Sequence, residues 1–143
     1  MAGGKGSTFE ADLLKLIFQA VAIANIGDNA AASPLTSLYV SLHTASPAGG
    51  TQATSEAAYT SYARVAVART TGGWAISGNS ITPVATIAFP AATAGSETET
   101  FMGIGVASSG ATKLLYYGPL TPTIVVSNGV TPQLSTATAI TES

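Results

Sequence analysis

Residues 38–43, with the sequence LYVSLH, decide the fold class of this 143-residue chain. Apolar side chains occupy every second position, so Leu38, Val40 and Leu42 share one face of an extended segment. This alternation predicts a half-buried β-strand, with His43 pointing outward near its end.

Further short segments with strand-like patterns follow towards the C-terminus: they are residues 62–69, 74–77, 84–89, 100–107, 113–118, 123–127 and 133–141. The residues between them are rich in turn formers, for example residues 119–122 and 128–129. Residues 71–73 (TGG) predict a hairpin that joins 62–69 to 74–77. Short strands separated by Gly and Pro turns predict a mainly β fold, an antiparallel β-sandwich or barrel.

Upstream of these strands, apolar residues at helical spacing predict one N-terminal amphipathic α-helix over about residues 8–24. Ser7 and Glu10 have the spacing of a capping box, which favours a helix start at this point. Residues 25–29 supply turn formers that are expected to end the helix.

One face of this helix is expected to lie in an interface. The apolar residues on that face are Phe9, Leu13, Ile17 and Val21. We expect the face to be buried, either on the β domain or against a neighbouring subunit. Two arginines that bracket a predicted strand, Arg64 and Arg69, are expected to form interface salt bridges.

The length predicts a single β domain with its leading helix over residues 7–143. Residues 1–6 are rich in glycine and carry no apolar pattern, so we expect a flexible N-terminal arm. Residues 45–61 form a long polar segment. We expect this segment and the arm to become ordered on neighbouring subunits, because they offer few apolar anchors of their own.

Charge is scarce in the sequence. Lys and Arg number 5, Asp and Glu number 7, and charged residues make up 8% of the chain, against about 25% in an ordinary globular protein. A net charge of −2 does not favour nucleic acid as a partner. With a mean hydropathy of +0.38, the composition predicts a surface that is buried in an assembly.

The chain has no cysteine and one histidine. Disulfides, zinc–thiolate sites and iron–sulfur clusters are therefore excluded within it, and no metal or cofactor is expected. Residues 13–26 bear some likeness to an export or membrane segment. They are too short to span a bilayer and lack a basic start, so we expect a soluble helix and no membrane partner.

Catalysis would have to use few groups. His43 could join a serine and Asp12 or Asp28 in a triad, but neither aspartate has the sequence context of a triad member. Glu97 and Glu99 could act as an acid–base pair, but like charges two residues apart more often protect a strand edge, so we favour an edge or a solvated loop. We therefore expect that the protein is not an enzyme.

Two further motifs favour structural roles. Residues 103–105 (GIG) begin like a dinucleotide-binding fingerprint but lack its third glycine, so we expect a bulge or a close backbone approach. Trp74 with Tyr116 and Tyr117 could form a sugar-binding platform. Adjacent strand residues face opposite sides, however, which favours core packing.

A set of short segments carries a resemblance by its order and spacing. The segments are residues 38–45 (LYVSLHTA), 62–67 (YARVAV), 89–90 (FP), 101–105 (FMGIG), 108–110 (SSG), 114–118 (LLYYG) and 129–132 (GVTP). Together they resemble a family of small tailed-bacteriophage virion proteins, which includes capsid decoration (cement) and tail-fibre-like proteins. Members often carry an amphipathic helix ahead of the same β pattern. The resemblance brings no catalytic or metal-binding residues.

The resemblance implies a structural protein of the virion, assembled in the host cytoplasm. The favoured role is a capsid decoration protein that binds the major capsid protein or other virion proteins and stabilises the head through many modest contacts. A tail, collar or fibre component that could bind a host receptor is the alternative. We expect self-association as a homotrimer, which would match the local threefold sites of an icosahedral lattice.

Overall fold

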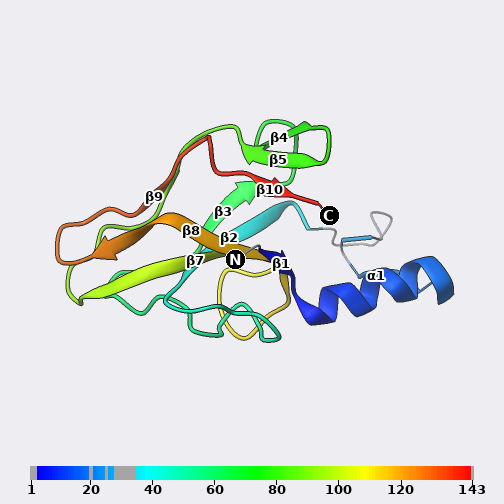
Figure 1. The fold of residues 1–143 in the computed structure, drawn as a ribbon, viewed down its shortest axis with the longest axis horizontal. Helices are drawn as coiled ribbons and strands as arrows, with labels where there is room; N and C mark the ends of the chain where they lie inside the picture. Colours follow the sequence, from blue (N-terminus) through cyan, green and yellow to red (C-terminus); the bar gives the residue numbers. More distant parts are fainter. Residues whose placement is uncertain (1–2, 20, 25, 28–34, 143) are drawn as a thin grey trace.

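The computed structural model describes residues 3–19, 21–24, 26–27 and 35–142 (Figure 1), without the side chains of residues 14–17. The predicted helix stop at residues 25–29 therefore falls largely outside the described residues. The side chain of Ile17 does so as well.

Five antiparallel strands form the central sheet. Their order is β1 (Gly4–Lys5), β8 (Leu114–Val126), β7 (Glu97–Gly105), β2 (Ser37–His43) and β3 (Val65–Ala68). The strand predicted from the LYVSLH pattern is confirmed as β2. It lies inside the sheet, between β7 and β3.

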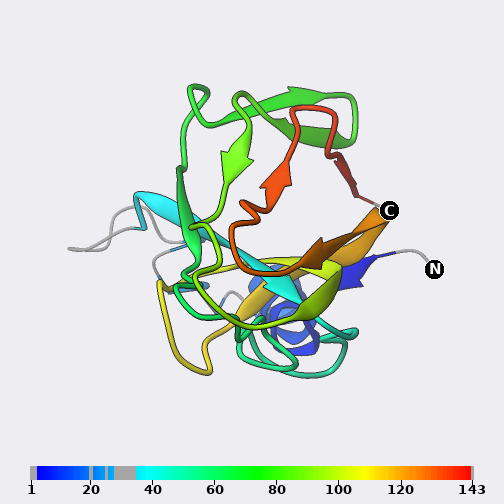
Figure 2. The ribbon, with the colours of Figure 1, turned by 90° about the vertical axis from the view of Figure 1, so that its left-hand side faces the viewer.

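Two smaller sheets lie on one side of the central sheet (Figure 2). One contains β10 (Ile140–Thr141), β5 (Ser80–Pro83) and β4 (Trp74–Ser77), and the other pairs β6 (Ile87–Ala88) with β9 (Gln133–Leu134). The long loop after β2, the loop after β7 and helix α1 lie on the other side. The central sheet is therefore covered on both faces.

The predicted fold class is confirmed as mainly β, with antiparallel sheets and one short helix near the N-terminus. The sheets are open, and no closed barrel forms in the described part of the chain. Short strands end the central sheet on both sides, with two residues in β1 and four in β3. Because these edge strands do not pair with each other, the barrel alternative is excluded.

The main hydrophobic core lies between the central sheet and the smaller sheets. Val40 and Leu42 are fully buried in it, as the alternation predicts, and Leu38 packs against it. The other buried members are Ala57, Tyr59, Trp74, Ile87, Phe89, Ala92, Met102, Ile104, Val126 and Leu134. A second, smaller core contains Phe9, Ile23 and Leu115, and it attaches the N-terminal segment to β8.

Helix α1 (Ser7–Gln19) is shorter than predicted. The helix was expected to reach about residue 24 by its periodicity, but residues 21–24 are not helical. Ile23 is buried beside Phe9 in the smaller core. In this non-helical segment Ile23 packs with Phe9 and Leu115, a contact that the helical periodicity does not predict.

The Gly-rich N-terminal segment also differs from the prediction. Gly4 and Lys5 form β1 and pair with Tyr116 and Tyr117 of β8, where a flexible arm is predicted. Glycine permits this close pairing, since a Cβ on Gly3 would lie 2.1 Å from the backbone oxygen of Tyr117.

The predicted hairpin at residues 71–73 does not form. β3 pairs with β2, whereas β4 pairs with β5 through a turn at Gly78, whose φ of +60° suits glycine. The backbone N–H groups of Gly73 and Trp74 both donate to the carbonyl of Thr70. This turn therefore carries the chain from the central sheet to a smaller sheet.

Residues 113–118 and 123–127, predicted as separate strands, belong to one strand, β8. Pro119 and Pro122 lie inside this strand. They are tolerated because the pairing of β8 with β7 is irregular here. Pro119 pairs with Phe101 and Ile124 with Glu99, so Pro122 lies in a bulge, and β1 covers only residues 116–117 of the outer edge.

The remaining strands are shifted or divided relative to the prediction. Residues 84–89 contain only the short β6, and residues 133–141 contain both β9 and β10. β5 was not predicted, and β7 begins at Glu97 instead of residue 100.

Phe9→Ala should detach α1 from the β domain. Phe9 is 6% exposed, and its ring centroid lies 5.6 Å from that of Tyr116. We expect the free energy of unfolding, measured with urea, to fall by about 3 kcal/mol, with faster amide exchange in α1. Val125→Ala, at a side chain that is 68% exposed, is the control and should change this free energy by less than about 0.5 kcal/mol. An unchanged free energy in Phe9→Ala would contradict the packing role of Phe9.

Candidate functional site

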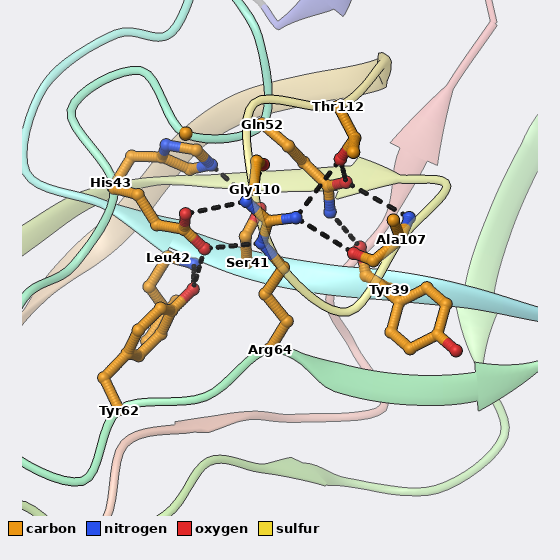
Figure 3. A network of polar contacts seen from close by, with 12 residues as sticks. Tyr39, Ser41, Leu42, His43, Gln52, Tyr62, Arg64, Ala107, Gly110 and Thr112 are labelled. Carbon is orange, nitrogen blue, oxygen red and sulfur yellow. Dashed lines mark hydrogen bonds and ion pairs between the residues drawn. The ribbon is translucent and has the colours of Figure 1, made fainter.

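A buried polar network joins β2 to the two loops that cover it (Figure 3). Arg64 lies at its centre and is 8% exposed. Its Nε and Nη2 atoms donate to the two carboxylate oxygens of Glu56 at 2.6 and 2.8 Å. Nη1 donates to the carbonyl of Ala107 at 2.9 Å and to Oγ1 of Thr112 at 3.2 Å, and Nη2 also donates to the carbonyl of Gly110 at 2.7 Å. All five N–H donors of the guanidinium are thus used within the chain.

Gln52 continues this network and is fully buried. Its Nε2 donates to the carbonyl of Tyr39 at 2.9 Å, and its Oε1 accepts from Oγ1 of Thr112 at 2.9 Å. Gly105 leaves the space for this side chain, because a Cβ there would lie 2.1 Å from Cδ of Gln52. Gln52 therefore fastens the long loop to β2 and to the loop that follows β7.

Tyr62 closes the network on the core side. Its hydroxyl donates to Oε1 of Glu56 at 2.9 Å and accepts from the backbone N–H of Leu42 at 3.1 Å. Its ring stacks with that of Phe89 at a centroid distance of 6.3 Å. Burial raises the pKa of Tyr62, so its hydroxyl stays protonated.

Residues 45–61, which were expected to have few apolar anchors and to become ordered on neighbouring subunits, are anchored on their own domain, whereas their contact with other subunits stays a prediction. Gln52, Ala57 and Tyr59 from this segment are all buried. The ring centroids of Tyr59 and Tyr62 lie 5.4 Å apart. The segment packs on its own domain because its few large side chains meet β2 and β7, contacts that composition alone does not reveal.

His43 was predicted to point outward, but it is fully buried. The long loop covers the sheet face on which His43 lies, and Nδ1 of His43 donates to the carbonyl of Thr54 at 2.8 Å. Because a carbonyl only accepts, Nε2 carries no proton in neutral His43 and accepts from Oγ of Ser41 at 2.9 Å. Burial lowers the pKa of His43, which favours this neutral form.

Ser41 and His43 have the contact of a nucleophile and its base. Both side chains are fully buried, however, so a substrate cannot reach them. Gly103 on β7 leaves no space beside the pair, because even a Cβ there would lie 2.7 Å from Nε2 of His43 and 2.8 Å from Oγ of Ser41. The close backbone approach predicted for residues 103–105 is confirmed, and the strand register shifts between Ile104 and Gly105. The arrangement is structural.

Glu97 and Glu99 lie on β7 inside the fold, where a strand edge or solvated loop was predicted. Oε1 of Glu97 accepts from the backbone N–H groups of Ala58 and Tyr59, each at 2.8 Å. Glu99 is fully buried, and among the described residues no group donates a hydrogen bond to its carboxyl oxygens. Burial and the neighbouring Glu97 raise the pKa of Glu99 to about 8. The sequence pattern alone does not show that the long loop covers this end of β7.

The predicted interface residues of the helix do not form one continuous face. Phe9 is buried, Leu13 packs partly buried against the same small core, and Val21 is 49% exposed beyond the end of α1. The side chain of Ile17 lies outside the described residues. Contact of these residues with a second chain stays a prediction.

The two predicted interface arginines have partners inside the chain. Arg64 is the centre of the buried network. Nη2 of Arg69 donates to the carbonyl of Ile26 at 2.7 Å, and its backbone N–H donates to the carbonyl of Thr36. These bonds hold the part of the chain that precedes β2 to the end of β3.

The aromatic platform that was considered does not form. Trp74 is 7% exposed and belongs to the main core. Tyr116 packs on Phe9, and its hydroxyl donates to Oε2 of Glu142 at 2.8 Å. The core packing favoured for Trp74 is therefore confirmed.

A groove of about 680 Å³ lies between β8 and the C-terminal segment, residues 133–142. Its apolar lining includes Met102, Leu120, Ile124, Leu134 and Ile140. Lys5 and Glu142 also line the groove and form an ion pair with each other. The charges of this groove are thus neutralised within the chain.

Sequence reasoning missed Gln52, Glu56 and Tyr62. Their partners lie on other loops and strands, so their sequence neighbours carry no signal of the network. In the described part of the chain, no group of three or more His, Asp or Glu residues could hold a metal ion. No described helix is long and apolar enough to cross a membrane.

Residues 8–141 match the family model for Gp80, described as podophage GP4 fiber I protein gp80. The matched range includes α1 from its second residue and every described strand except β1. No curated protein matches the chain.

Arg64→Met should strongly destabilise the fold, because Glu56 and two backbone carbonyls lose their donors. We expect a loss of about 3–5 kcal/mol in the free energy of unfolding, measured with urea at pH 7. Arg64→Lys, which keeps the charge but not the planar fork, should lose less than Arg64→Met. Equal stability of Arg64→Met and the unmodified protein would contradict the central role of this ion pair.

The lowered pKa of His43 predicts acid sensitivity. The unfolded chain takes up a proton near the ordinary value of 6.5, whereas the folded chain resists it, so the stability from neutral His43 is lost as pH falls below that value. Between pH 5 and 7 this contribution should change by up to about 1.4 kcal/mol per pH unit. Subtracting the urea-unfolding profile of His43→Gln from that of the unmodified protein isolates it. Parallel profiles would rule out this role of His43.

Proposed function

Since this chain belongs to the family of podophage GP4 fiber I protein gp80, a tailed-phage virion protein family, we propose that it is a fibre subunit. It is a structural protein of the virion. The observation that carries the proposal is the family match over residues 8–141, which covers the helix and nearly the whole β domain.

The geometry supports a role in assembly and not in catalysis. The side chains that could take part in catalysis, those of Ser41, His43 and Arg64, are buried. Ser41 bonds to His43, and Arg64 bonds to the loop that follows β7. Their hydrogen bonds stabilise the covering loops. A domain whose loops are held in this way suits a structural building block.

Helix α1 supplies a surface for a neighbouring subunit. It extends away from the β domain (Figure 1), and Phe18 near its end is 77% exposed. Phe18 follows Phe9 by nine residues, which is about two and a half helical turns, so the two rings face opposite sides. With Phe9 packed on β8, Phe18 cannot reach the same domain. This supports burial of Phe18 on a second chain.

Self-association as a homotrimer remains part of the proposal. Other large apolar side chains are exposed on the β domain, namely Ile76 at 76% and Val125 at 68%. With charged residues at only 8% of the sequence, little opposes the approach of further copies or other virion proteins. The number of copies in one assembly can be measured by light scattering.

A capsid decoration protein bound to the major capsid protein is the second candidate. The charge-poor composition favours it as much as it favours a fibre, because both roles bury a large part of the surface. We favour the fibre because the family is described as a fiber protein. Binding of a host receptor would be an additional function of a fibre, and a test of it requires a host ligand.

Imaging of purified virions tests the two roles. Density for this chain in projections from the tail or collar, in a small number of copies, is expected for a fibre. Density spread over the capsid surface in many copies would overturn the fibre assignment and support decoration.

Phe18→Ser should reduce incorporation into virions without destabilising the isolated domain. The side chain is largely exposed in the single chain, so the free energy of unfolding should change by less than about 0.5 kcal/mol. Loss of a buried aromatic anchor typically weakens an interface by about 2 kcal/mol or more. Incorporation is measured by quantitative mass spectrometry of particles.

Val84→Ser, at an apolar residue of the β domain that is 49% exposed, is the matched control for that experiment. It separates a general effect of surface polarity from a specific contact of the helix. Normal incorporation of Phe18→Ser would show that this end of α1 is not an attachment surface.

A further inference from the structure

Two carboxyl groups on β7 meet the end of the long loop. Glu99 is fully buried, and neither of its carboxyl oxygens receives a hydrogen bond from a donor in the described part of the chain. Glu97, two residues earlier on the same strand, binds the backbone N–H groups of Ala58 and Tyr59 through one oxygen, at 2.8 Å each. The carboxyl group of Glu99, which accepts no hydrogen bond from any residue described, therefore lies close to the loop residues that Glu97 holds.

The surroundings of Glu99 favour a proton on its carboxyl group. The titratable groups that face it are Glu97 on its own strand and Tyr59 on the loop. Both are acids, and the hydroxyl of Tyr59 already donates to the carbonyl of Pro90 at 2.9 Å. A second negative charge in this buried place would be neither solvated nor paired. Glu97 already serves as an acceptor, so Glu99 is the group that holds the proton.

We propose that a proton shared by Glu97 and Glu99 fastens residues 58–59 to β7, and that loss of this proton releases them. The proton leaves one negative charge between the two carboxyls, and the two backbone N–H groups satisfy it. Without the proton, the two carboxylates repel each other, and Glu99 must reach water.

The segment that is released carries part of the main core. Tyr59 and the neighbouring Ala57 are both buried in the main core. The backbone N–H of Ala57 donates to the carbonyl of Leu42, and that of Thr60 donates to the carbonyl of Ala94. Release of the segment would therefore uncover the core at one end of β7 and loosen the chain on both sides.

The direction of the pH effect follows from the raised pKa of Glu99. In the closed state this pKa is about 8, and in the open state it returns to the ordinary 4.5. The fastening is complete below the lower value and is lost as pH rises through the higher one. The equilibrium constant for opening should rise about tenfold per pH unit between about pH 5 and 8, and then level off.

Hydrogen exchange tests the proposal. Protection factors of the Ala58 and Tyr59 amides, corrected for the intrinsic pH dependence of exchange, are measured by NMR from pH 5 to 9. The unmodified protein should lose protection about tenfold per pH unit up to about pH 8. Glu99→Gln, which cannot ionise, should keep a protection factor that changes less than about twofold over this range.

Glu142→Gln is the matched control, because it removes a carboxylate that pairs with Lys5 of the edge strand β1 and does not lie on β7. It should keep the pH profile of the unmodified protein at Ala58 and Tyr59. Equal profiles in Glu99→Gln and the unmodified protein would overturn the proposal.

Two measurements on the unmodified protein do not depend on how the variants fold. The side-chain carboxyl carbon of Glu99 should titrate with a midpoint near 8, and a midpoint near 4.5 would overturn the proposal. The protection profile should be the same in calcium and in a chelator. Protection that requires calcium would mean that a cation holds the two carboxylates together, which also overturns it.

Discussion

The fold depends on the burial of the Arg64 guanidinium with the carboxylate of Glu56. A guanidinium removed from water is stable only when every N–H has an acceptor, and here Glu56, Thr112 and two carbonyls provide them. These acceptors come from two loops far apart in the sequence. Satisfying one side chain therefore requires both loops to close over β2, and their closure buries His43 and Gln52.

Much of the architecture could be predicted from short-range patterns. The alternation in residues 38–43 identified β2 and its buried face, and the helical spacing after Ser7 located α1. The errors have physical causes. Pro119 and Pro122 suggest a break, but the strand continues through a bulge in its pairing with β7, where a missing N–H donor is tolerated. Residues 71–73 resemble a hairpin turn, but the partner of β4 is the later strand β5.

The site was less predictable because its contacts connect distant parts of the chain. Arg64 was singled out, but as an interface residue, and Glu56 lies within a segment whose composition indicates only a polar loop. The burial of His43 and Glu99 follows from the loop that covers them. A local pattern identifies which face of a strand a residue occupies, and not whether that face is covered. The two glycines of residues 103–105 were the exception, because their spacing already indicated a close approach.

The outer edge of β8 has a consequence for solubility. An exposed strand edge normally serves as a template on which another strand can add, and such growth leads to aggregation. Pro119 and Pro122 have no N–H to donate and lie where β8 is bulged, and β1 occupies the neighbouring residues 116–117. A protein with so few charges could not rely on repulsion to keep its copies apart. The prolines instead make this edge a poor template, so ordered assembly can proceed through side chains without competition from sheet extension there.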